Sequence, residues 1–186
     1  EESGWEVIPF LEVKAIDESN NITFDIETLA NRGDHLSAIG VAREFSARYL
    51  TPLKLPKMVS ALTDKKSQTL LKVETEKCSR YALLDIQLPE TLNISQRIKD
   101  ILGETDPERH NIVHLLNYIQ IELGQPMHAF DFDKIEGEIK VVLIAKEEEV
   151  EALDGKTYKV PSESILIRDR KKTIAVAGVI GLSNSM

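Results

Sequence analysis

The feature of this sequence that most constrains its fold is a run of apolar residues at helical spacing, bounded at both ends. Apolar side chains recur every three or four positions at Ile112, Leu115, Leu116, Ile119 and Leu123. Asp106 suits an N-cap, Pro107 tolerates the first helical position, and Gly124 suits the residue after a helix end. The pattern predicts an amphipathic helix that buries one face against other elements.

Alternating apolar and polar residues predict strands over residues 11–15, 22–26 and 139–145, and short apolar segments predict further strands over residues 71–75, 81–88, 165–167 and 173–179. The segment Leu153–Lys156 predicts a hairpin turn in which glycine takes positive φ. Two further helices are predicted. One runs over residues 36–49, with its cap in the polar cluster Asn31–Asp34, and the other runs from Pro89 to Leu102.

The chain of 186 residues has the length of one domain, which can consist of two lobes. Residues 51–69 carry prolines and a polar tail, a composition typical of a connector. We therefore expect a smaller lobe over about residues 1–55, a connector over about 56–69 and a larger lobe over about 70–186.

The overall charge of the chain has the wrong sign for a nucleic-acid binder. The chain has 31 acidic against 23 basic residues, a formal net charge of −8 and a pI of about 5.1. Such a chain can touch RNA only through a local basic patch or with a partner. The single cysteine excludes an internal disulfide, and no targeting signal or membrane-spanning stretch is visible. We therefore expect a cytoplasmic protein without membrane contact.

Common catalytic and metal-binding patterns are incomplete. His110 and His114 have the four-residue spacing of metal ligands, but Asn111 stands where a metalloprotease helix has glutamate and no third ligand is evident. We expect no metal site. No Gly-x-Ser-x-Gly motif indicates a serine hydrolase. The short basic runs Lys65-Lys66 and Arg170–Lys172 are interpreted as solvated turns.

One segment suggests a site. Residues Gln125–Asp131 have neither helical nor strand periodicity, and His128 lies among them, while Asn117 lies on the helix that leads into the segment. Because histidine can carry a proton near neutral pH, these residues predict a small polar pocket. The alternative is a buried histidine that donates to a backbone carbonyl, which composition alone favours.

Four blocks of the sequence resemble, in order, the beta subunit of bacterial phenylalanyl-tRNA synthetases. The blocks are Asn31–Ser37 with Gly40–Glu44, Asn117-Tyr118 with Gly124–Asp131, Leu153–Gly155, and Ala175–Gly181. Any one of them alone would be only a motif hypothesis, whereas four in register are specific. The resemblance covers essentially the whole chain.

The resemblance implies the central editing module of that subunit, part of a much longer chain. In the family this module hydrolyses tyrosine wrongly attached to phenylalanine tRNA. The implied fold is α+β, with layered mixed β-sheets of unusual topology and flanking helices in one compact two-lobed unit. The implied partners are the catalytic alpha subunit, in a heterotetramer, and the acceptor end of the tRNA. ATP and magnesium are expected for the whole synthetase, and no cofactor for this segment.

The resemblance also implies roles for single residues. His128 and Asn117 match the catalytic positions of the editing pocket. The matched substrate-binding positions are Gln125, Pro126, Met127, Ala177 and Gly178. Ala177 and Gly178 are expected to form a backbone wall beside the amino acid. Water is the implied nucleophile.

Two positions depart from the family pattern. Leu116 stands where the family has threonine, and His114 stands where it has an acidic residue. The family's glutamate that recognises the tyrosine hydroxyl is expected beyond Met186, so we expect the isolated segment to be weakly active or inactive. Two alternatives stay open: a structural or interaction domain of the same subunit with a degenerate site, and a free-standing trans-editing hydrolase.

Overall fold

The computed structural model describes residues 11–18, 20, 22–56, 67–103 and 111–185. The chain divides into two units. The first holds residues 1–56 and 119–125, and the second holds residues 57–118 and 126–186. The predicted connector lies mostly outside the described residues, and the joining of both lobes into one compact unit stays a prediction.

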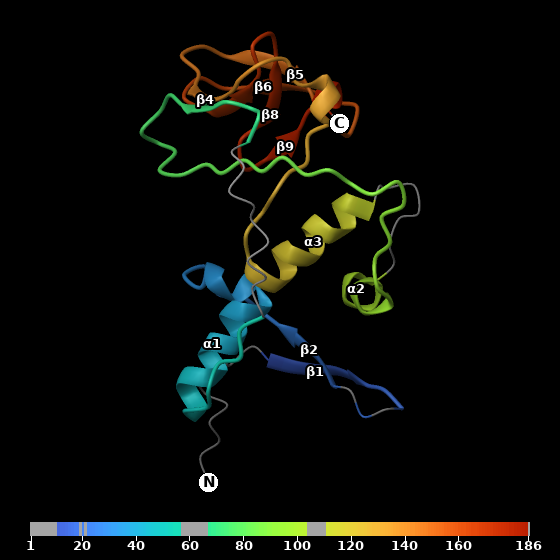
Figure 1. The fold of residues 1–186 in the computed structure, drawn as a ribbon. Coiled ribbons are helices and arrows are strands. Elements are labelled where there is room, and N and C mark those ends of the chain that lie inside the picture. Colours follow the sequence, from blue (N-terminus) through green and yellow to red (C-terminus); the bar gives the residue numbers. More distant parts are fainter. Residues whose placement is uncertain (1–10, 19, 21, 57–66, 104–110, 186) are drawn as a thin grey trace. The chain divides into compact units, whose positions relative to one another are not determined.

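The first unit contains an antiparallel hairpin of β1 (Leu11–Ile16) and β2 (Ile22–Ile26), drawn in blue in Figure 1. Both strands were predicted from their alternation. The pairing shifts register between Val13 and Ala15, which marks a bulge. Two-stranded ribbons are marginal by themselves in water, so this hairpin depends on further packing.

Helix α1 (Ala38–Tyr49) follows the hairpin and begins at a later cap than predicted. Ser37 is the N-cap: its hydroxyl accepts from the Gly40 N–H at 3.2 Å and donates to the Asp34 carbonyl at 3.0 Å. The preceding polar cluster does not cap α1 because its end forms the 3-10 turn η2 (Gly33–Leu36). Ser37, directly before the helix, thus provides the acceptor that the free N–H groups of the first turn of α1 need.

The second unit is built on a five-stranded mixed sheet. Its strand order is β3 (Leu71–Val73), β4 (Ile139–Leu143), β7 (Ile165–Arg168), β8 (Thr173–Val176) and β9 (Ile180–Gly181). β3 and β4 pair in parallel, and the other neighbours pair antiparallel. In Figure 1, the C-terminal strands β8 and β9 of this sheet are drawn in red.

A second hairpin covers one face of this sheet. β5 (Glu148–Glu151) and β6 (Thr157–Val160) flank the predicted turn, in which Gly155 has φ of 75°. Val150 and Val160 from the hairpin share a buried cluster with Leu166 of β7, whereas the next residue, Ile167, belongs to a second buried cluster. Successive strand residues point to opposite faces, so the sheet has a core on each side.

Two helices are shorter in the described residues than their patterns predicted. α2 covers Gln96–Leu102, and α3 covers Asn111–Leu123. α2 begins late because Ser95 takes the N-cap position and its hydroxyl accepts from the Ile98 N–H. The predicted cap of α3 at Asp106 and Pro107 lies outside the described residues.

The strand predicted over residues 81–88 is wrong. Tyr81 and Leu83 pack against the second core cluster, but Leu84 and Ile86 are 60% and 61% exposed and the segment joins no strand ladder. Only the start of this segment rests on the sheet.

The predicted α+β class is confirmed, because helices and a mixed sheet occur together without regular alternation. Within the described part of the chain, no helix is long and apolar enough to cross a membrane.

Candidate functional site

The segment that carries His128 leaves α3 through a glycine and is fixed at its far end. Gly124 has φ of 76° and donates its N–H to the Gln120 carbonyl at 2.8 Å, which closes the helix. Residues 125–131 then form neither helix nor strand, as predicted. At the end of the segment, the Asp131 N–H donates to the carbonyl of Ser185, a fully buried residue, at 3.0 Å.

The imidazole of His128 packs on Gly181 of β9. A Cβ placed on Gly181 would lie 2.2 Å from Cε1 and 2.5 Å from Nε2 of His128, and 2.9 Å from Cδ1 of Leu153. Only a residue without a side chain permits this approach. Sequence reasoning noted Gly181 inside a family motif but assigned it no role. The sequence signal that could have indicated a close approach to the backbone is a glycine directly after the apolar residue Ile180.

The ring of His128 is open on one side and packed on the other. Phe130 meets it edge-on, with ring centroids 4.7 Å apart and planes at 69°. The residue as a whole is exposed, so the alternative of a buried core histidine is wrong. Partial burial still lowers the pKa of His128 from its ordinary 6.5, and the ring is neutral at pH 7. Among the described residues, no group hydrogen-bonds its ring nitrogens.

The predicted backbone wall lies just ahead of Gly181. Ala177 and Gly178 form the turn between β8 and β9, in which Gly178 has φ of 72° and the Val179 N–H donates to the Val176 carbonyl at 3.1 Å. This turn ends the strand predicted over residues 173–179 at Val176. Gly178 is exposed, and no atom lies within 4 Å of the position its Cβ would take.

The other predicted site residues are less closely joined to His128. Asn117 is half-buried on α3, and across the described residues no hydrogen bond links its side chain to His128. Met127 is 44% exposed, and Gln125 and Pro126 are exposed. Their substrate-binding roles stay predictions.

The histidine pair considered for metal binding is only half described. His114 is buried at 5% exposure on α3, and His110 lies outside the described residues. No group of three His, Cys, Asp or Glu side chains in the described ranges could hold a metal ion.

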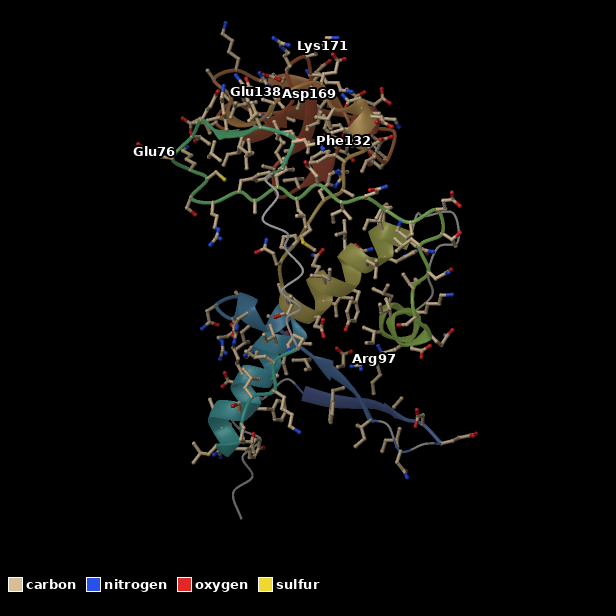
Figure 2. The ribbon with its side chains drawn as sticks, viewed as in Figure 1. Glu76, Arg97, Phe132, Glu138, Asp169 and Lys171 are labelled. Carbon is tan, nitrogen blue, oxygen red and sulfur yellow. The ribbon has the colours of Figure 1, made fainter. Side chains whose placement is uncertain are left out.

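A charged hollow of about 560 Å³ lies over the ends of β3, β4, β7 and β8. Its lining is almost entirely ionic: Glu74, Glu138, Lys140, Val142, Glu148, Arg168, Asp169, Arg170, Lys171, Lys172 and Thr173. Figure 2 labels Glu138, Asp169 and Lys171 in this part of the second unit. The sequence predicts a solvated turn at Arg170–Lys172, but no sequence pattern indicates the surrounding hollow.

Asp169 organises one wall of this charged hollow. Its carboxylate accepts from the backbone N–H groups of Glu136, Lys171 and Lys172 at 3.1, 2.7 and 2.8 Å, and the residue is 5% exposed. Burial raises the pKa of this carboxyl, but the three backbone donors outweigh burial and hold the pKa below its ordinary 3.8. An aspartate that begins a tight turn is the sequence signal that could have identified it.

Comparison with known proteins identifies the family. The family described as the B3/4 domain matches residues 77–186. The chain belongs to the B3/4 domain family. The match begins after β3 and includes α2, α3 and strands β4 to β9, and hence His128 and its surroundings.

Relatives of this B3/4 domain include two phenylalanine-tRNA ligase beta subunits. One, from Fusobacterium nucleatum subsp. nucleatum, is 37% identical over 173 residues, which cover 89% of this chain and 21% of the relative. The other, from Aquifex aeolicus, is 37% identical over 158 residues, covering 84% and 20%. The chain thus spans about a fifth of the length of these relatives. The resemblance drawn from the four motif blocks is confirmed.

A solved structure with a related description is an N-terminal fragment of the phenylalanyl-tRNA synthetase beta-subunit from Pyrococcus horikoshii. It matches with a TM-score of 0.40 and 18% sequence identity, covering 97% of this chain and 57% of that one.

Proposed function

We propose that this B3/4 domain is the editing module of a phenylalanyl-tRNA synthetase beta subunit and hydrolyses tyrosine from mischarged phenylalanine tRNA. The observation that carries the proposal is the exposed, neutral imidazole of His128, held against Gly181, which follows the Ala177–Gly178 turn in the chain. In this proposal the domain works in the cytoplasm beside the alpha subunit, which with ATP and magnesium performs aminoacylation.

The proposed reaction needs little more than an oriented water. Water attacks the ester carbonyl carbon, the bond from that carbon to the ribose oxygen breaks, and the products are free tyrosine and tRNA with its hydroxyl restored. A neutral imidazole can accept the proton that water loses and return a proton to the ribose oxygen. The low pKa of His128 supports this role because it keeps the ring unprotonated at pH 7.

The chemical need for such a module follows from the limits of apolar pockets. A synthetic site shaped for a phenyl ring has limited power to reject a ring that merely adds a hydroxyl. A second site with polar groups placed for the phenolic hydroxyl reverses the preference, because phenylalanine would leave each such buried group unpaired at a cost of about 1–3 kcal/mol.

The competing candidate is a structural or interaction domain of the same subunit. Two observations favour it: Leu116 and His114 replace polar and acidic residues of the family pattern, and Asn117 forms no hydrogen bond with His128 in the described residues. A free-standing trans-editing hydrolase is the third possibility.

The deciding experiment measures tyrosine release from preformed mischarged tRNA by the complete synthetase that carries this domain. We expect His128→Ala to slow release by about 10- to 100-fold, near the lower end for a positioned proton-transfer group. Aminoacylation with phenylalanine should stay unchanged and serves as the control for folding and assembly. A wild-type complex that releases no tyrosine would eliminate the editing function and favour the structural one.

The pH dependence separates a proton-transfer role from a structural one. Because the pKa of His128 lies below 6.5, the rate of tyrosine release should be level above about pH 7 and should fall only on the acid side of 6.5. His128→Ala should remove this acid limb. An unchanged limb in the variant would exclude His128 as the proton acceptor.

A further inference from the structure

Three cationic side chains stand in register across the sheet at the charged hollow. Lys72 on β3 pairs with Lys140 on β4, and Lys140 pairs with Arg168 on β7. Directly paired residues project from the same face of a sheet, so the three cations form one row. Such a row would repel itself unless anions intervene.

Carboxylates form ion pairs with the cations of this row. Glu138 lies 2.6 Å from Lys72 Nζ and 3.2 Å from Lys140 Nζ, Glu74 lies 3.3 Å from Lys140 Nζ, and Glu148 pairs with Arg168. The hydrogen bonds from both lysines hold the pKa of Glu138 below its ordinary value, so this carboxylate stays charged. Every cation of the row thus has a carboxylate partner, and a cationic surplus can come only from groups outside the row.

Cationic groups are left over at the β7 and β8 end. The Nε–H of Arg168 is buried and has no acceptor. Arg170 is exposed, and among the described residues no carboxylate lies in ion-pair range of it, while Gly137 lies against its aliphatic stem. Neighbouring Lys171 is exposed and forms an ion pair with the exposed carboxylate of Glu136, from which solvent and other anions can displace it. Asp169, another carboxylate of the lining, is turned to backbone N–H groups.

We propose that this end of the charged hollow binds the phosphodiester backbone of RNA, with Arg170 and Lys171 as the principal contacts. The inference rests on the proposed function only for the choice of RNA as the partner. In a chain with eight excess negative charges, such a local basic end is the means by which the domain can meet RNA at all.

The lining favours phosphate over other anionic partners. It contains no aromatic side chain on which bases could stack and a single apolar one, Val142, so a peptide would find almost no surface to bury. Guanidinium and ammonium groups suit phosphate oxygens and read no base sequence. Binding should therefore be weak, independent of sequence and steeply dependent on salt.

The test is a salt titration of the 186-residue chain with a fluorescein-labelled single-stranded RNA of about ten nucleotides, read by anisotropy. For a single strand, each phosphate contact contributes about 0.7 to the slope of log K against log salt. We expect Arg170→Ala to weaken binding several-fold at low salt and to reduce this slope by about 0.7. Lys159→Ala, which removes the same charge from β6 outside the charged hollow, is the matched control and should bind as wild type does.

A second variant should change RNA affinity in the opposite direction. Glu138→Gln frees Lys72 and Lys140 from their shared carboxylate and should tighten RNA binding and steepen the slope. A gain of affinity cannot come from unfolding. The proposal is overturned if wild type does not bind RNA, if Arg170→Ala and Lys159→Ala bind equally, or if a glutamate-rich peptide of matched charge binds more tightly than RNA. Binding is measured without ester hydrolysis, so its failure is distinct from failure of the editing function.

Discussion

Gly181 is the residue on which the geometry at His128 depends. Its backbone requires no left-handed conformation; the missing side chain is what matters, because the imidazole occupies the space that a Cβ would take. Leu153 closes over the same spot from the hairpin turn, and its N–H donates to the Gly181 carbonyl at 3.1 Å. His128, Gly181 and Leu153 therefore form one packed unit at the candidate site.

A double-mutant cycle at this contact gives the first prediction for single residues. Gly181→Ala should destabilise the protein by about 1–3 kcal/mol, because the new methyl group overpacks against the imidazole. In the His128→Ala background the same substitution should cost clearly less, since the clashing ring is gone. The free energies of unfolding of the four proteins, from denaturant titrations, measure this coupling.

Two outcomes of the cycle are distinguishable. Equal costs of Gly181→Ala in both backgrounds would mean that Leu153, not His128, limits the space at Gly181. Under the proposed editing function, Gly181→Ala in the complete synthetase should also slow tyrosine release while phenylalanine charging stays constant, because the added methyl group displaces the imidazole from Gly181.

At the scale of secondary-structure elements, the strands that alternate and pair were predictable, and the exceptions have physical causes. The segments 22–26 and 139–143 alternate and lie in ladders. Residues 81–88 were also predicted as a strand but join no ladder, because a sequence pattern cannot reveal whether a partner strand is present. The helix starts at Ser37 and Ser95 were displaced because several polar residues compete for each cap.

The candidate site was predictable only in part for a related reason. The loop of His128 follows from a local signal, namely a broken period, whereas the turn at Gly178 falls inside the strand predicted over residues 173–179 and was missed. The approach of His128 to Gly181 joins residues far apart in the chain, and no local pattern encodes it. The charged hollow likewise arises from strand register, which places Lys72, Lys140 and Arg168 side by side.

The turn between β7 and β8 gives a prediction for an element. Oδ1 of Asp169 holds the turn through Lys171 and Lys172, whereas Oδ2 accepts from the Glu136 N–H and so fastens the segment before β4. An asparagine can keep only one oxygen, and its amide would face an N–H donor. Asp169→Asn should therefore destabilise the protein by about 1–3 kcal/mol at pH 7.

The same variant has a defined pH dependence. The pKa of Asp169 is depressed in the folded state, so its contribution is present above the unfolded pKa of about 3.8 and is lost as the pH falls through the lower folded value. The difference in free energy of unfolding between wild type and Asp169→Asn should shrink as the pH falls from about 5 toward 2. Asp133→Asn, the same change at an exposed position, should show little difference at any pH.

At the scale of the whole molecule, the division of the chain cuts through a helix. Residues 111–118 of α3 belong to the second unit, and residues 119–123 belong to the first with the glycine that ends the helix. Either half is far below the roughly 12–15 residues at which an isolated helix becomes marginally stable in water. Each unit therefore contains a part of α3 that is too short to be helical without the part in the other unit.

This dependence predicts that the two units unfold together, as a single calorimetric transition of the intact chain. A chain of residues 1–56 lacks residues 119–125, which the first unit takes from α3, and retains a two-stranded hairpin and α1 with Leu50 and Leu55 exposed at 91% and 60%. It cannot bury enough apolar surface to be stable alone, and its amide protons should exchange without protection. Calorimetry of the full chain and hydrogen exchange of residues 1–56 check both halves of the prediction. Two separate transitions, together with a protected core in residues 1–56, would establish that the units fold independently and that α3 merely passes from one to the other.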